Sequence, residues 1–119
     1  MIDPKILAAT QDFKETRDGY RADSPAVIEA FFSLKQAAMT QGPIDAVTKA
    51  LIAVLLGVAH QSERCVLSHA EAAVLAGVSR EQLIDGLGLT VVFGGAPGYG
   101  FATLALDTFD TFADKLQPA

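Results

Sequence analysis

The sequence has 119 residues, half of them apolar and 19% charged, a composition typical of one folded domain and not of a disordered chain. A formal net charge of −5 leaves no basic face to neutralise phosphates, so we expect neither nucleic acid nor a membrane surface as a partner. The lone cysteine, Cys65, excludes an internal disulfide. The residues after Met1 lack the basic and apolar regions of a signal peptide, and we expect a cytoplasmic protein.

Charged side chains are unevenly distributed along the chain. Residues 1–42 carry eleven of them, whereas residues 86–106 carry none. The uncharged stretch is long enough to raise the question of a membrane span, but the glycines and the proline in residues 94–98 would break a spanning helix near its middle. We therefore expect no span. Because a chain this small cannot bury so much apolar surface, we expect part of that surface to face another subunit.

Helix patterns recur along the chain and convincing strand alternation does not, which predicts an all-α fold of about six helices. The first is expected over residues 4–20. The second begins at Ser24 and Pro25, a cap residue followed by proline, and ends near residue 42. The third, over residues 44–60, is apolar on nearly every face, which indicates a central buried helix.

The second half of the chain shows clearer helix boundaries. A fourth helix is expected to begin near Ser62 and to end at Gly77, which can adopt the left-handed conformation at the end of a helix. The fifth begins at Ser79 with the capping box Ser79–Gln82 and continues to about residue 93. After the glycine-rich turn, Pro97 can open a last helix that ends before residue 118.

One group of residues suggests chemistry, and it lies at the predicted start of the fourth helix. If Ser62 caps that helix, Cys65 occupies its third position, where free backbone N–H groups and the helix dipole favour a thiolate. His69 follows four residues later on the same face. Its imidazole can take the thiol proton, and the Ser62 hydroxyl can contribute a hydrogen bond from the turn below. This spacing indicates an activated cysteine.

Two other interpretations of the same residues stay open. Cysteine is often buried as a small apolar side chain, and a Cys/His pair four residues apart arises easily without a function. A metal site would need more ligands, because Cys65 and His69 are two of the four expected for structural zinc and His60 is the only other histidine. We therefore expect neither a bound metal nor a cofactor.

Several segments resemble the carboxymuconolactone decarboxylase and alkyl hydroperoxidase D superfamily. The matching residues are Asp45–Ile52, Cys65, His69, Glu71–Ala73, Ala76–Glu81 and the Gly94–Pro97 turn. The resemblance covers a core of residues 43–115, preceded by N-terminal helices in residues 1–42, within a single domain of residues 1–119. It implies an all-helical, alkyl hydroperoxidase D-like fold and a homo-oligomer, either a trimer or a hexamer.

The hydroperoxidase branch of this superfamily has the signature C-x-x-C-x-x-x-H with a glutamate on the preceding helix. Cys65 aligns with the second cysteine, which attacks peroxide, and His69 aligns with the relay histidine. Ser62 stands in place of the first, resolving cysteine, and Ala50 in place of the glutamate. The resemblance implies an antioxidant enzyme, a thiol-dependent peroxidase or disulfide oxidoreductase, with Cys65, His69 and Ser62 at its catalytic site and a small-molecule substrate.

The two departures from the signature leave other functions open. Without a partner thiol at Ser62, a sulfenic acid on Cys65 cannot form a disulfide within the chain, and an external thiol reductant would be needed. The decarboxylase branch offers non-redox lactone chemistry, in which His69 would act with a nearby cation such as Arg64. A third interpretation is a catalytically silent oligomeric binding or scaffold protein.

Overall fold

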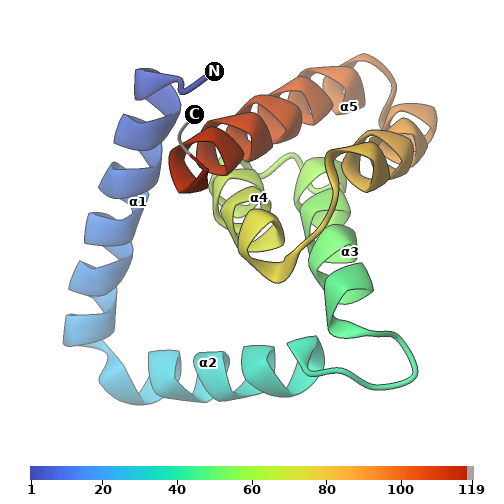
Figure 1. Ribbon diagram of the computed structural model, residues 1–119. Helices are drawn as coiled ribbons and strands as arrows, with labels where there is room; N and C mark the ends of the chain where they lie inside the picture. The colour runs from blue at the N-terminus through green and yellow to red at the C-terminus, as the bar shows by residue number, and fades with distance from the viewer. Residues whose placement is uncertain (118–119) are drawn as a thin grey trace.

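The computed structural model describes residues 1–117, which form helices and no strand, so the predicted all-α class is confirmed. Five helices follow one another along the chain: α1 (Pro4–Asp23), α2 (Pro25–Met39), α3 (Ala46–Ala59), α4 (Glu63–Ala76) and α5 (Arg80–Leu116). Gly95 has non-helical dihedral angles and divides α5 into two rods (Figure 1). The structure therefore agrees with the prediction of about six helices.

The helix boundaries follow the capping residues. Ser62 precedes α4 and accepts a hydrogen bond from the backbone of the third helical residue, and Gly77 ends α4 with φ of 93°. Ser79 and Gln82 form the predicted capping box at the start of α5. Ser24 precedes α2 as predicted, but its side chain makes no capping hydrogen bond. Asp3 and Asp45 cap α1 and α3 in the same way, so α2 alone among the five helices begins without a side-chain cap.

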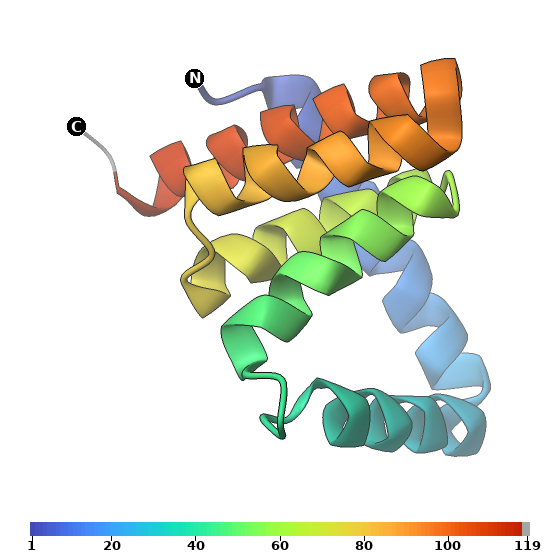
Figure 2. The same ribbon diagram turned by 90° about the vertical axis from the view of Figure 1, so that its right-hand side faces the viewer.

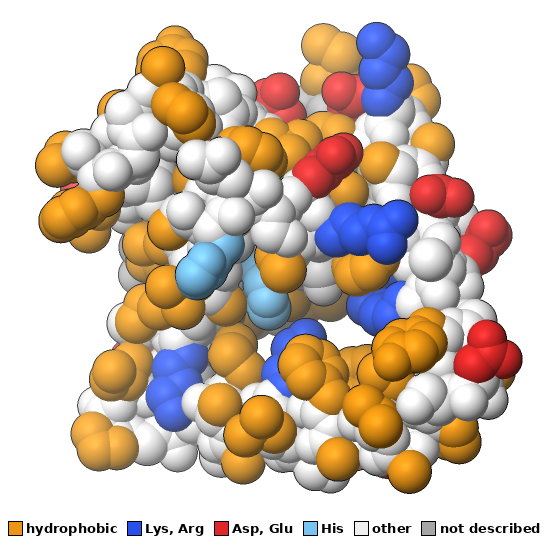
Figure 3. Space-filling view, turned by 180° about the vertical axis from the view of Figure 1, so that it is seen from behind, with side chains coloured by type: hydrophobic (Ala, Val, Ile, Leu, Met, Phe, Trp, Pro, Cys, Tyr) orange, Lys and Arg blue, Asp and Glu red, His pale blue; other side chains and the backbone are white. Residues whose placement is uncertain are grey.

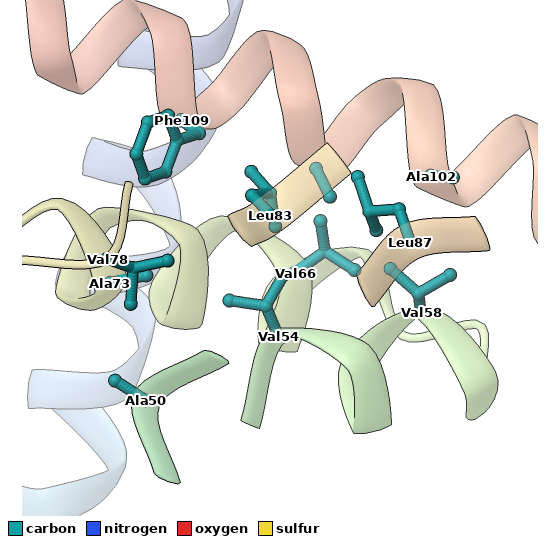
Figure 4. Packing of buried hydrophobic residues seen from close by; sticks show 11 residues of the cluster. Ala50, Val54, Val58, Val66, Ala73, Val78, Leu83, Leu87, Ala102 and Phe109 are labelled. Atoms are coloured by element: carbon teal, nitrogen blue, oxygen red, sulfur yellow. The ribbon is translucent and has the colours of Figure 1, made fainter. Parts of the chain in front are cut away.

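The core lies where α3, α4 and α5 pack together (Figure 4). Its buried apolar side chains come from all three helices and from the turn before α5: Ala50, Val54, Val58, Val66, Ala73, Val78, Leu83, Leu87, Ala102, Ala105 and Phe109. A second, smaller cluster of Ile6, Leu67 and Phe112 joins α1 to α4 and α5. Burial of these side chains supplies the main stabilisation of the fold.

The α5 hairpin is a structural consequence of two glycines. Gly95 has φ of 60° and ψ of −142°, a conformation that L side chains rarely adopt, and here the second rod folds back beside the first (Figures 1 and 2). Gly98 lets the rods approach closely, because a Cβ at that position would lie 2.5 Å from the carbonyl oxygen of Thr90. By length and composition alone, α5 is apolar enough to cross a membrane, but the reversal divides it into two shorter rods.

Helices α1 and α2 form a frame beside this core. No residue of α2 is buried, and its Val27, Phe31 and Leu34 side chains are exposed. Figures 1 and 2 both show α2 set apart from α4 and α5. The expectation that α3 is buried on nearly every face is wrong in part, because Ile52 and Leu56 are exposed. These two side chains lie four residues apart on one face of α3, and the rest of residues 1–117 leaves that face uncovered.

Candidate functional site

The turn between α3 and α4 places the start of α4 directly against α3. Gln61 has φ of 54°, and the N–H groups of Gln61 and Ser62 donate to the carbonyls of Val58 and Gly57 at 3.0 and 3.1 Å. Gly57 is buried at the crossing, where an added Cβ would lie 3.3 Å from the Cβ of Cys65. The absence of a side chain at Gly57 thus allows the cysteine to lie close to α3.

Two of the three predicted site residues line the same cavities. The Cys65 thiol is free and exposed, and the half-buried His69 lies one helical turn away, about 6 Å along the axis of α4. Both residues line a cavity of about 300 Å³ between α3, α4 and the end of α2. Both also line a second cavity of about 230 Å³ between α1, α2 and α4. A small molecule in either cavity would meet both side chains.

Ser62, the third predicted site residue, has a different position. Its hydroxyl accepts a hydrogen bond from the backbone N–H of Cys65 at 3.3 Å, which is the predicted capping contact. Ser62 lines neither of the two cavities. In the structure, Ser62 therefore caps the first turn of α4, which carries the Cys65 thiol.

The surroundings of His69 favour the neutral form of its imidazole. Burial, and to a smaller extent the positive charge of Lys35, lower the pKa of His69 below its ordinary value of 6.5. A neutral imidazole has one ring nitrogen free to accept a proton. The position of the signature glutamate provides no carboxylate for His69, because Ala50 stands there, buried in the core. The nearby Glu71 pairs with Lys14 at 3.2 Å.

Sequence reasoning missed the basic side chains of the second cavity. Arg17 from α1 and Lys35 from α2 line it together with Cys65 and His69. The Cζ atom of Arg17 lies 5.3 Å from the centre of the Phe13 ring. The spacing of Phe13 and Arg17, four residues apart on one helix, was a local indication of this pair, but nothing in the sequence placed it beside the cysteine. Figure 3 shows basic and histidine side chains around a hollow on this face of the molecule.

Arg64, the cation expected to assist lactone chemistry, lies over the Phe13 ring with its Cζ atom 5.2 Å from the ring centre. Lys49 donates from Nζ to the carbonyl oxygens at the end of α2, at 2.9 and 2.7 Å, and Arg80 pairs with Asp110 at 2.9 Å. Within residues 1–117, no group of three or more His, Cys, Asp or Glu side chains is arranged to hold a metal ion.

Comparison with known proteins gives consistent matches. Residues 25–108 match the sequence model of the carboxymuconolactone decarboxylase family. An uncharacterised protein of Cupriavidus necator is 40% identical over 86 residues, which are 72% of this chain and 76% of that protein.

Solved structures match over most of the chain. The apo form of a carboxymuconolactone decarboxylase family protein of Legionella pneumophila has a TM-score of 0.89 at 35% identity, covering 93% of this chain and 99% of that one. A family protein of Thermotoga maritima, for which an involvement in the antioxidative response has been suggested, has a TM-score of 0.75 at 20% identity. That alignment covers 95% of this chain and 93% of the Thermotoga chain, and it supports the fold alone.

Proposed function

Because this chain belongs to the carboxymuconolactone decarboxylase family, we propose that it is a thiol-dependent peroxidase of the alkyl hydroperoxidase D type, with Cys65 as its one redox residue. The observation that carries the proposal is the shared position of a free thiol and an imidazole. Both line the same two cavities on successive turns of α4, and the cysteine lies in the first turn of that helix. Backbone N–H groups and the helix dipole favour a thiolate at such a position.

The proposed reaction begins with a proton transfer. His69 accepts the proton from Sγ of Cys65, and the thiolate attacks the distal oxygen of a hydroperoxide. An S–O bond forms, the O–O bond breaks, and the alkoxide leaves with the proton that His69 carried. The sulfur is oxidised by two electrons to a sulfenic acid, and the hydroperoxide is reduced to an alcohol.

Regeneration needs a thiol from outside the chain, because Ser62 offers no second sulfur. An external thiol attacks the sulfenic acid, releasing water and forming a mixed disulfide, and a second thiol reduces that disulfide and restores Cys65. The exposure of Cys65 supports this step, since a reductant can reach the sulfur. Each cycle consumes one hydroperoxide and two thiols.

The test is the consumption of cumene hydroperoxide in the presence of dithiothreitol. Cys65→Ser should abolish turnover, and His69→Gln should reduce the rate roughly 10²-fold, the usual loss for a general acid–base group. Dimedone should trap the sulfenic acid on Cys65 after hydroperoxide is added without a thiol. Turnover that survives Cys65→Ser would contradict the proposal, because the hydroperoxide would then be reduced without the Cys65 thiol.

A second variant tests the missing resolving thiol. Ser62→Cys restores the C-x-x-C spacing, in which the new thiol can condense with the sulfenic acid of Cys65 to give an internal disulfide. Oxidised protein of this variant should then contain an intramolecular disulfide and resist dimedone. Leu75→Cys is a suitable control, because it adds a thiol at an exposed position of α4 about 15 Å along the helix from Cys65, which is beyond the reach of a disulfide. If the oxidised Ser62→Cys protein lacks an internal disulfide and reacts with dimedone as the control does, the thiol at position 62 does not condense with a sulfenic acid on Cys65.

A further inference from the structure

The second cavity, between α1, α2 and α4, combines three kinds of lining. Its walls are apolar, with Phe13, Ile28, Phe31 and Phe32. Two basic side chains, Arg17 and Lys35, lie on the same lining, and so do Cys65 and His69. Among residues 1–117, no Asp or Glu lines it. An apolar cavity with a positive region and a reactive thiol suits a ligand that has an apolar body and one anionic group.

The basic groups of this cavity lack carboxylate partners among the described residues. Ion pairs within residues 1–117 involve Lys14, Arg21, Arg80 and the terminal amine of Met1, and neither Arg17 nor Lys35. Arg17 lies instead over the Phe13 ring, and Lys35 is near enough to His69 to lower the pKa of that imidazole. In a chain of net charge −5, two unneutralised cations beside one apolar cavity indicate a preference for an anion.

We propose that Arg17 and Lys35 make this cavity a binding site for organic hydroperoxides that carry a carboxylate. The inference rests on the proposed peroxidase function and names its substrate class. The carboxylate would bind between the guanidinium of Arg17 and the ammonium of Lys35, and the apolar body would lie along the phenylalanines of α1 and α2. This arrangement directs the hydroperoxide group toward Cys65 and His69, which lie on the α4 side of the cavity.

The strength expected of this recognition is that of charge-assisted hydrogen bonds. Hydrogen bonds to charged groups are stronger than neutral ones, and one such bond is enough for at least a tenfold preference. Cumene hydroperoxide and its para-carboxylate differ only in the anionic group, so their ratio of kcat/KM measures the preference directly. We expect the para-carboxylate to be favoured at least tenfold by the unaltered protein.

Two variants and one control test which residues create the preference. Lys35→Gln and Arg17→Gln should each lower the ratio, and the double variant should bring it close to one. Lys5→Gln is the matched control, because Lys5 lies on α1 about 18 Å along the helix from Arg17 and should keep the original ratio. Two results would overturn the inference. One is a kcat/KM ratio near one in the unaltered protein, and the other is a tenfold preference that persists in the double variant.

A binding measurement separates this inference from the peroxidase proposal. The probes are 4-isopropylbenzoate and its uncharged amide, 4-isopropylbenzamide, and the readout is protection of Cys65 from alkylation by iodoacetamide. The carboxylate should protect at a concentration at least tenfold lower than the amide, and the double variant should remove this difference. If no hydroperoxide is reduced but the carboxylate still protects selectively, the peroxidase proposal fails and the anion site stands. Equal protection by both probes would overturn the anion site.

Discussion

The core formed by α3, α4 and α5 and the frame formed by α1 and α2 are built by different means. The core joins its helices through eleven buried apolar side chains, whereas α2 has none. Within the frame, α1 is joined to the core by the small apolar cluster of Ile6, Leu67 and Phe112, whereas α2 is held at its ends by polar contacts. Arg21 pairs with Glu29 at 2.6 Å and lies over Phe32, and Lys49 donates to the carbonyls at the end of α2. Exposed contacts of this kind contribute little stability each. The reactive thiol is therefore carried by the stable part, and the walls of its second cavity by the weakly attached part.

The largest expected difference between core and frame is in side-chain truncation. Leu83 in the core is fully buried, so Leu83→Ala should lower the free energy of unfolding by about 3 kcal/mol, from lost burial and the cavity left behind. Phe31 on α2 is 54% exposed, and Phe31→Ala should cost less than about 1 kcal/mol in the monomer. Urea unfolding of both variants at low protein concentration measures this. Equal losses would mean that the frame is a second core.

Glycine substitution should distinguish the two parts next. Gly98→Ala places a methyl group 2.5 Å from the carbonyl oxygen of Thr90, and pushing the α5 rods apart should cost about 1–3 kcal/mol. Gly19 in α1 has open space around it, so Gly19→Ala should stabilise by about 0.5–1 kcal/mol through helix propensity. Thermal unfolding should thus show shifts of opposite sign. A neutral Gly98→Ala would show that the rods separate easily.

Loss of a helix cap should have a smaller effect, and only where the cap residue makes a side-chain hydrogen bond. Ser62→Ala removes the hydrogen bond to the Cys65 N–H and should cost about 1 kcal/mol. Ser24→Ala is the control in the frame, since the Ser24 side chain makes no capping bond, and it should be nearly neutral. The comparison uses chemical denaturation of the two variants side by side. A cost at Ser24 equal to that at Ser62 would contradict the observed difference in capping.

The smallest expected effect is a pH dependence that links the two parts. Because the pKa of His69 is lowered by burial and by Lys35, the unfolded chain binds a proton at this site more readily than the folded chain does. Stability should therefore fall as the pH drops through 6.5, down to the lowered pKa of the folded protein. Urea midpoints at several pH values should show this loss shrinking in His69→Gln and, to a lesser degree, in Lys35→Gln. A loss unchanged by His69→Gln would assign it to other groups.

Local features of the fold were predictable from the sequence because they depend on neighbouring residues. Ser62, Gly77 and Ser79 act within one turn of the helices that they start or end, and all three were predicted correctly. The break within residues 94–98 was predicted too, since a proline and glycines interrupt a helix whatever surrounds them. The direction of the second rod after Gly95 depends on packing between distant parts of the chain, and the sequence did not determine it.

The site was predictable to the same extent. Cys65 and His69 share a face of α4 because they are four residues apart, which is a local relation, and the structure places both on the lining of two cavities. Arg17 and Lys35 come from two other helices, so their approach to the thiol depends on how the frame meets the core. For the same reason, the apolar sequence of α3 did not reveal that Ile52 and Leu56 are left uncovered.

The lack of any buried residue in α2 has a consequence for access to the site. A helix held mainly at its ends can open locally at a free energy well below that of global unfolding, and its amide hydrogens should exchange with solvent ahead of those in α4 and α5. Such an opening moves Ile28, Phe31 and Phe32 away from Cys65 without disturbing the helix that carries the thiol. The second cavity can thus admit a bulky molecule when α2 opens transiently, and it needs no permanent channel.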